Sequence, residues 1–326
     1  MNPDEINEPI WKVPPPRASV MPARPPDPAC QTITLQIDGR TVTVPAGTTL
    51  LQAASRLGLR IPTLCWAPTL TPINACRICV VEVEGARTLA PACARPAEAG
   101  MVVQTGSERV RLSRKLVLEL LASSVALDRA PELLRLIQEY GADPERFGPS
   151  AAPADRRDAR HAGHHHVGDG ATAETVAQPV KVDNSLYVRD YARCVLCYKC
   201  VEACGTDAQH TFAITIAGRG FDARVSTEWD APLPEGACVY CGNCINVCPT
   251  GALVFRTEHE LREAGSWAPE RQQETDTICP FCGVGCTLRV KVQDDKLVSV
   301  TSPPEVDVTG GNLCVKGRFG TSYVNG

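Results

Sequence analysis

Apolar and polar residues alternate in "QTITLQIDGRTVTVPAG" (31–47) on both sides of an Asp-Gly pair. This alternation around Asp-Gly predicts a β-hairpin closed by a tight turn. "TTLLQAASRLG" follows as a short amphipathic helix, with Thr48 or Thr49 as its N-cap and Gly58 at its end. The strand-like runs "CVVEVEG" and "MVVQTG" then complete a small domain that closes near Gly106.

Helical periodicity appears next, in "SERVRLSRKLVLELLAS" and "APELLRLIQEYG". These stretches predict two packing helices, the second ended by Gly141. Near the C-terminus, "TLRVKV" and "KLVSV" predict two strands around an Asp-Asp turn. The pattern therefore predicts an α+β chain made of small modules rather than one large domain.

Seven segments follow from these patterns and from composition. We expect a proline-rich disordered arm (1–29), a β-grasp domain (30–106), a helical segment (107–148), a flexible linker (149–180), a cysteine-dense unit (181–257), a charged connector (258–275) and a β-rich last domain (276–326). The linker holds "HAGHHH" (161–166). Metal binding by these histidines is the alternative to a solvated, mobile tract, and we assign them no role.

Cysteine content determines the expected chemistry. The chain has 17 Cys in 326 residues and a formal net charge of −4, which argues against a nucleic-acid-binding surface. Its first residues, "MNPDEINEPIWKVPPPR", contain no apolar signal core, and no stretch is apolar for long enough to span a membrane. We therefore expect a cytoplasmic protein whose cysteines bind metal rather than form disulfides.

The central unit contains the spacing C-x2-C-x2-C-x3-C twice. This repeat resembles the two-cluster bacterial ferredoxins, in which the fourth cysteine of each run binds the other [4Fe–4S] cluster. The resemblance implies one quartet of Cys194, Cys197, Cys200 and Cys248, and a second quartet of Cys238, Cys241, Cys244 and Cys204. Gly205 stands where the ferredoxin run has proline. Zinc is the alternative, although paired C-x2-C zinc knuckles do not form quadruple runs.

A third set of cysteines lies in the first domain: Cys65, Cys76, Cys79 and Cys93. With "LCWAPTLTPINACRICVVEVEG" and the β-grasp pattern, it resembles the [2Fe–2S] domain of complex I and of NAD-linked hydrogenase diaphorase subunits. Buried cysteines that only fill a core are the alternative. Those relatives commonly follow this domain with a one-His, three-Cys cluster site. This chain has no cysteine between Cys93 and Cys194, so we expect that cluster to be absent.

The fourth set comprises Cys279, Cys282, Cys286 and Cys314. "CPFCGVGC" and "NLCVKGRFG" resemble the N-terminal [4Fe–4S] domain of molybdopterin-guanine-dinucleotide oxidoreductases, especially formate dehydrogenases. The resemblance places Lys316 between this cluster and a pterin; a solvent-exposed lysine is the alternative. Cys30 belongs to no set and is expected to be a spare thiol.

From about residue 30 onward, the chain resembles the electron-transfer half of the alpha subunit of cytoplasmic NAD-linked formate dehydrogenase. The resemblance implies one [2Fe–2S] and three [4Fe–4S] clusters here, with molybdopterin guanine dinucleotide (Mo or W), FMN and NAD on partner chains. No catalytic residue and no glycine-rich dinucleotide fingerprint is present. We expect a separate catalytic chain to dock on residues 276–326, with a fragment of a longer protein as the alternative. A small diaphorase subunit of an NAD-reducing hydrogenase and a free electron carrier are the competing functions.

Overall fold

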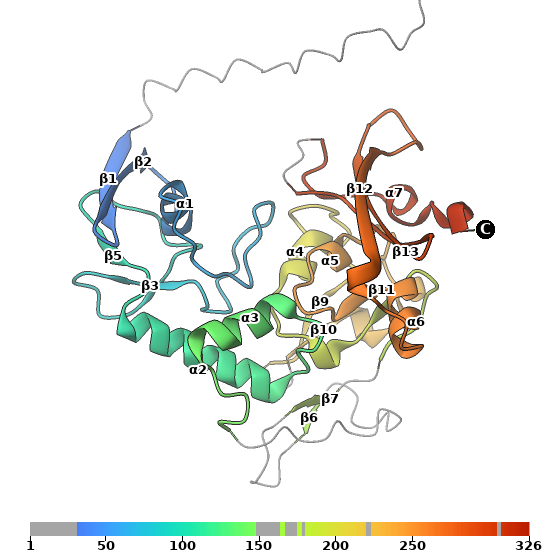
Figure 1. Cartoon of the computed structure of the whole chain (residues 1–326), viewed down its shortest axis with the longest axis horizontal. Coiled ribbons are helices and arrows are strands. Elements are labelled where there is room, and N and C mark those ends of the chain that lie inside the picture. Colours follow the sequence, from blue (N-terminus) through green and yellow to red (C-terminus); the bar gives the residue numbers. More distant parts are fainter. Residues whose placement is uncertain are drawn as a thin grey trace, which may run out of the picture.

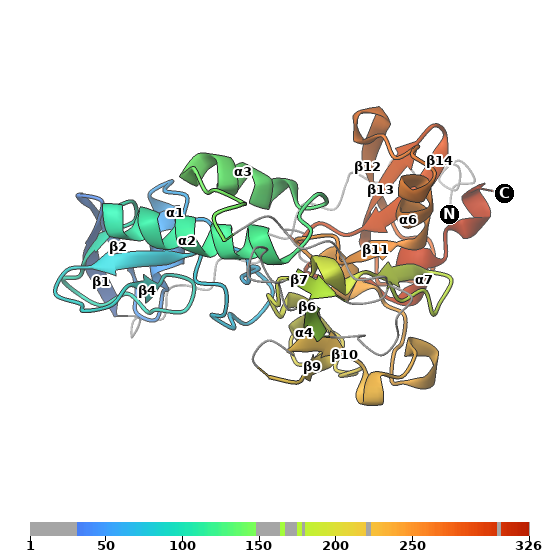
Figure 2. The same ribbon diagram turned by 90° about the horizontal axis from the view of Figure 1, so that it is seen from below.

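A computed structural model of the chain describes residues 31–147, 164–166, 175–177, 180–219, 223–304 and 308–325. The predicted N-terminal arm and Cys30 lie outside these residues. The described part forms three units in a row, with the N-terminal sheet at one end and the C-terminal sheet at the other (Figure 1, Figure 2).

The first unit is a five-stranded mixed sheet with the order β2-β1-β5-β3-β4. Its elements are β1 (Thr32–Ile37), β2 (Arg40–Pro45), α1 (Leu50–Arg56), β3 (Val80–Val83), β4 (Ala90–Pro91) and β5 (Val102–Gln104). Strand β1 pairs antiparallel with β2 and parallel with β5. The inward residues of the sheet, such as Leu35 and Val44, form one core with Leu50 and Ala54 of α1.

The predicted hairpin and helix of this unit are confirmed. Asp38 and Gly39 both have positive φ, 49° and 74°, as a two-residue turn between twisted strands requires. Thr49 is the N-cap of α1, and a capping box joins it to Gln52. The prediction of small mixed helix-and-strand domains also holds, whereas assignment of this sheet to the β-grasp class stays a prediction.

Helices α2 (Glu108–Ser124) and α3 (Pro131–Tyr140) confirm the two predicted helices. Gly141, with φ 58°, ends α3 as expected. The pair extends from the N-terminal sheet to the central unit (Figure 1). Its buried leucines pack with residues of both units, so the helices join the first unit to the second.

The central unit is built from short elements around two cysteine loops. They are β8 (Tyr187–Arg189), α4 (Lys199–Cys204), β9 (Thr215–Ala217), β10 (Arg224–Ser226), α5 (Asn243–Asn246) and β11 (Leu253–Phe255), with short 3-10 turns at Tyr191–Arg193, Glu228–Asp230 and Leu233–Glu235. Strand β8 pairs with β11, and β9 pairs with β10, both antiparallel. Two further strands, β6 (His164–His166) and β7 (Thr175–Ala177), pair within the stretch predicted to be a linker.

The last unit is an antiparallel sheet, β12 (Gln272–Ile278), β13 (Thr287–Gln293) and β14 (Lys296–Thr301). The predicted Asp-Asp turn joins β13 to β14, with φ 51° at Asp294 and 60° at Asp295. Helix α6 (Arg256–Glu263) and the start of β12 occupy the predicted connector 258–275. Helix α7 (Val315–Phe319) follows Cys314, and 3-10 turns lie at Pro269–Arg271 and Ser322–Asn325. Among the described residues, no helix combines the length and apolar character needed to cross a bilayer.

Candidate metal centres

The two central cysteine runs fold into the same loop twice. In each run, the residues on either side of the second cysteine have positive φ: Leu196, Tyr198, Tyr240 and Gly242. These turns place the backbone N–H of Leu196 3.4 Å from Cys194 Sγ. In the second run the N–H of Tyr240 lies at the same distance from Cys238 Sγ. Both loops therefore direct backbone donors at a cysteine sulfur.

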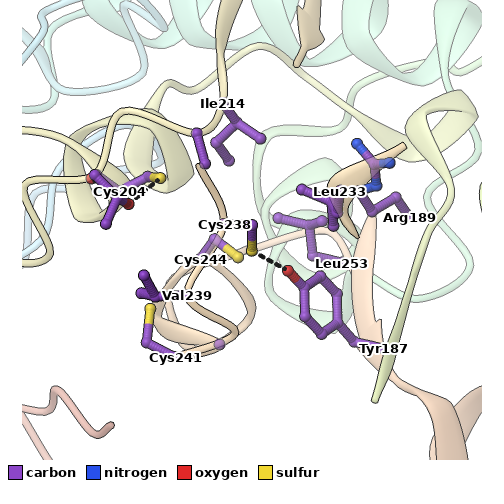
Figure 3. Close-up of a pocket in the computed structure, with 13 residues that line it drawn as sticks. Tyr187, Arg189, Cys204, Ile214, Leu233, Cys238, Val239, Cys241, Cys244 and Leu253 are labelled. Carbon is purple, nitrogen blue, oxygen red and sulfur yellow. Dashed lines mark hydrogen bonds between the residues drawn. The ribbon is translucent and has the colours of Figure 1, made fainter. Parts of the chain in front are cut away.

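The cysteines of these runs line two separate cavities, and each cavity takes three cysteines from one run and one from the other. The first is lined by Cys194, Cys197, Cys200 and Cys248. The second is lined by Cys204, Cys238, Cys241 and Cys244 (Figure 3). The fold gathers the same quartets that the resemblance to two-cluster ferredoxins implies.

Burial affects the charge state of the three thiols Cys194, Cys197 and Cys200. It raises the pKa of Cys194 to about 12 and that of Cys197 to about 11. The pKa of Cys200 lies well above its usual range for the same reason. A thiolate is the form that binds iron, and cationic irons would compensate for the burial of its charge. The four thiols around each cavity, which are buried or partly buried, therefore fit a bound cluster.

Hydroxyl groups lie beside two of the sulfurs in the second cavity. The Tyr187 hydroxyl is 3.2 Å from Cys238 Sγ (Figure 3). Burial raises the pKa of Tyr187, so this hydroxyl keeps its proton and can donate it to a thiolate. Thr211 Oγ1 lies 3.4 Å from Cys204 Sγ. These neighbours would stabilise negative charge on the sulfurs.

The thiols of the N-terminal set also converge. The Cys65 thiol lies near those of Cys76 and Cys93, and the Cys79 thiol lies near that of Cys93. Donation from Cys76 and Cys93 lowers the pKa of Cys65 far below its usual range. The pKa of Cys93 is raised because its proton is held between Cys65 and Cys79. The convergence of these four thiols fits a small two-iron cluster.

The fourth set lies at the surface of the last unit. The Cys279 N–H donates to the Cys286 carbonyl at 2.8 Å, and Cys314 is the N-cap of α7. The pKa of Cys286 is raised by burial and by the nearby thiols of the other three cysteines. Cys282 and Cys314 are exposed, and so is Lys316. The exposed apolar side chains around this set are Ile278, Phe281, Val284 and Val315.

The four sets are neighbours in a series. Cys65 and Cys197 belong to one apolar cluster that also contains Leu118 of α2. In the central unit, Cys200 and Cys244 are close enough for the charge of one to raise the pKa of the other. Arg318 lies where the second central set meets the last set, near Cys241, Cys244 and Cys314. Burial lowers its pKa to about 10, although the charges of these three cysteines act to raise it.

Within the described ranges, no three His, Cys, Asp or Glu side chains gather closely enough to hold a single metal ion. A cluster spreads its thiolates over several irons, so its ligands surround a cavity rather than a point. The sequence patterns did not reveal Tyr187, Asn243 or Arg318, because tertiary packing alone brings them to the cysteine loops. The "KGR" that follows Cys314 was the available signal for Arg318.

Three segments match family models. Residues 30–108 match a 2Fe-2S iron-sulfur cluster binding domain, residues 186–254 the ferredoxin-like domain of NADH-quinone oxidoreductase subunit 3, and residues 272–326 the molybdopterin oxidoreductase Fe4S4 domain. The chain thus contains three segments that match iron–sulfur cluster-binding domains.

Whole-chain similarity points to components of NAD(P)-linked oxidoreductase complexes. The chain is 35% identical to a component of the NADH-quinone oxidoreductase of Rhizobium meliloti, over 90% of this chain and 31% of that protein. It is 33% identical to the alpha subunit of the NADPH-Fe(3+) oxidoreductase of Geobacter sulfurreducens, over 90% of this chain and 32% of that protein. It is 38% identical to the HndD subunit of the NADP-reducing hydrogenase of Solidesulfovibrio fructosivorans, over 70% of this chain and 36% of that protein. The chain therefore spans about a third of the length of these relatives.

Among solved structures, a chain of the NAD+-reducing [NiFe]-hydrogenase in the H2-reduced state is similar, with a TM-score of 0.55 and 27% identity. The match covers 69% of this chain and 87% of that chain.

Proposed function

We propose that the chain carries one [2Fe–2S] and three [4Fe–4S] clusters as the electron-transfer subunit of an NAD-linked molybdopterin formate dehydrogenase. The [2Fe–2S] ligands are Cys65, Cys76, Cys79 and Cys93. The [4Fe–4S] ligands are Cys194, Cys197, Cys200 and Cys248; Cys238, Cys241, Cys244 and Cys204; and Cys279, Cys282, Cys286 and Cys314. When bound, each cluster supplies one-electron redox chemistry, and no residue of this chain is proposed as a catalytic acid, base or nucleophile.

The observation that carries this proposal is the linear order of the four thiol sets. Side chains connect each set to the next: Cys65 packs with Cys197, Cys200 lies near Cys244, and Arg318 lies among Cys241 and Cys314. The chain's own residues thereby hold the sets in a fixed sequence from one end of the molecule to the other. Such an order suits the conversion of a two-electron reaction into single-electron steps.

A molybdopterin-binding partner domain would cover the exposed end of this series. The match of residues 272–326 to the molybdopterin oxidoreductase Fe4S4 domain supports this assignment. Apolar Phe281 and Val315 beside exposed Cys282 and Cys314 offer a surface that such a partner would bury. In that complex Lys316 would lie between the cluster and a molybdenum or tungsten pterin. An FMN- and NAD-binding partner would lie near the Cys65 set, as the NAD(P)-linked relatives suggest.

A second candidate is the equivalent subunit of an NAD(P)-reducing hydrogenase or of an NADH-quinone oxidoreductase. The similarity to the NADP-reducing hydrogenase subunit and to the NAD+-reducing hydrogenase structure favours it. Formate, hydrogen or NADH as the electron source distinguishes a formate dehydrogenase, a hydrogenase and an NADH-quinone oxidoreductase. A free electron carrier would instead purify without a partner.

Anaerobic purification tests the proposal. We expect about fourteen irons per chain with matching acid-labile sulfide, and no formate-dependent NAD reduction by the chain alone. From the native host, the chain should copurify with a molybdopterin protein, and formate rather than hydrogen should reduce its clusters. Zinc or unligated thiols would overturn the cluster assignment. Copurification with a hydrogenase would replace the first candidate by the second.

A further inference from the structure

Helix α7 connects the last cysteine set to the second central loop. The helix begins directly after Cys314, and Arg318 on it is only 1% exposed. The Arg318 side chain leaves its own unit, and its Nε donates to the carbonyl of Cys241 at 2.7 Å. Its Nη2 donates to Asn243 Oδ1 at 3.0 Å, and its Nη1 to the carbonyl of Val300 at 3.2 Å. One guanidinium thus bonds to both units at once.

The cysteine loop is shaped to receive this side chain. A Cβ at Gly242 would lie 2.2 Å from Arg318 Cδ and 3.0 Å from the Phe319 ring, too close for any residue but glycine. The equivalent residue of the first run is Tyr198, which tolerates nearly the same backbone, with φ 65° against 68° at Gly242. The positive φ alone therefore does not require glycine in this loop. The close approach of Arg318 is what requires glycine at position 242.

Two further contacts strengthen the same junction. Asn243 Oδ1, already bonded to Arg318, also accepts the backbone N–H of Leu313 at 3.0 Å, one residue before Cys314. Phe319 stacks on Tyr187, with ring centroids 6.1 Å apart and 16° between the planes. The Tyr187 hydroxyl in turn contacts Cys238 Sγ. These contacts all lie at, or next to, a proposed cluster ligand.

We propose that Arg318 is a positioning residue that fixes the Cys279/Cys282/Cys286/Cys314 set against the Cys204/Cys238/Cys241/Cys244 set, so that single electrons pass across α7. This inference rests on the proposed function. One electron moves in each transfer. The donor site is oxidised by one electron and the acceptor site is reduced by one electron, with no proton transferred and no bond formed or broken. The guanidinium also adds a buried positive charge between the two sets, which favours the more negative, reduced state of both sites.

Two substitutions separate geometry from charge. R318K keeps the positive charge but can bond fewer of the three acceptors, and R318M removes the charge and all three bonds. The matched control is R262K, which alters an arginine of α6 that pairs with Glu258. The full chain with reconstituted clusters is analysed for iron and sulfide, by redox titration, and by electron paramagnetic resonance of the reduced state.

R318M is expected to shift the midpoint potentials of the C-terminal and second central clusters to more negative values. R318K should leave the potentials close to wild type but weaken the magnetic interaction between these two clusters. R262K should change neither. Potentials and spectra of R318M and R318K that match wild type, with full iron content, overturn the role of Arg318 and leave the proposed function intact.

G242A provides a second test if R318M does not fold, because it displaces Arg318 without removing it. We expect G242A to weaken the magnetic interaction as R318K does, and an unchanged interaction would overturn the inference. A wild-type chain without iron would instead overturn the proposed function, and the role of Arg318 with it.

Discussion

The Tyr187 hydroxyl lies 3.2 Å from Cys238 Sγ, on the wall of the cavity that the second central quartet lines. Tyr187 is 2% exposed, so water does not compete for this contact. A donor at this position stabilises the sulfur most when the site carries its extra electron.

Y187F should therefore lower the midpoint potential of the cluster held by Cys238. Loss of one such hydrogen bond is worth about 1 kcal/mol, or about 40 mV for a one-electron couple. A redox titration followed by electron paramagnetic resonance measures the shift. Y323F, at a tyrosine that is 67% exposed, is the control and should not move any potential. A Y187F potential equal to wild type would show that the hydroxyl does not bond to the sulfur.

The crossed quartets predict which cluster each cysteine serves. C248A should remove the cluster of the first run and leave that of the second, with a loss of about four irons. C204A should have the converse effect, because its thiol lines the cavity of the second run. Iron analysis and spectra of the remaining clusters distinguish the two variants. C30A is the control and should retain full iron. Loss of the second-run cluster in C248A would mean that the quartets do not cross.

Without iron, the stability of the chain should fall at alkaline pH. Burial raises the pKa of Cys194 to about 12 and that of Cys197 to about 11, from an ordinary value of 9.0. Between the ordinary and raised values the folded state holds protons that the unfolded state has lost, so stability decreases as pH rises through this window. Below pH 9.0 the contribution is fully present.

Thermal unfolding of the iron-free chain at about pH 8 and about pH 10.5 measures this effect. The iron-free C194A variant should show a smaller decrease, because it lacks one of the buried thiols. The cluster-loaded chain should show little of it, since its ligands are already deprotonated. An equal decrease in all three samples would assign the pH dependence to other groups.

Leu118 should be important for the junction between the first two units. Its side chain is fully buried in the apolar cluster that contains Cys65 and Cys197. L118A should lower the free energy of unfolding by about 3 kcal/mol, through lost burial and the remaining cavity. L112A, on the same helix but 52% exposed, should cost no more than about 0.5 kcal/mol. Denaturant unfolding compares the two, and equal losses would contradict a packed junction at α2.

Local sequence signals predicted those elements whose stability is local. The Asp38-Gly39 turn and the Thr49 cap depend on residues that are adjacent or nearly adjacent in the chain. Strand β12 was missed because its residues are almost all exposed, as expected of a polar edge strand, and its sequence "QQETDTI" has no apolar alternation. Strand β12 forms through its antiparallel pairing with β13, which its own composition does not indicate.

At the candidate metal centres, too, local features could be predicted from the sequence and tertiary contacts could not. Cysteine spacing indicated the loops, because each C-x2-C turn is encoded within a few residues, whereas only resemblance implied distant ligands such as Cys248 and Cys314. The contacts between quartets could not be predicted in this way. Arg318 meets Cys241 only when two units pack together, and Leu118 meets Cys65 through a helix that contains no cysteine. These junctions depend on tertiary structure.

Because Cys282 and Cys314 are exposed, the two ends of the cysteine series should differ in their resistance to oxidation. Oxygen and peroxide would reach this terminal site first, whereas Cys65, Cys79 and Cys93 at the other end are buried. Damage in air should therefore begin at the C-terminal cluster and proceed inward. A partner that covers this site would then protect the cluster from oxidation as well as supply electrons.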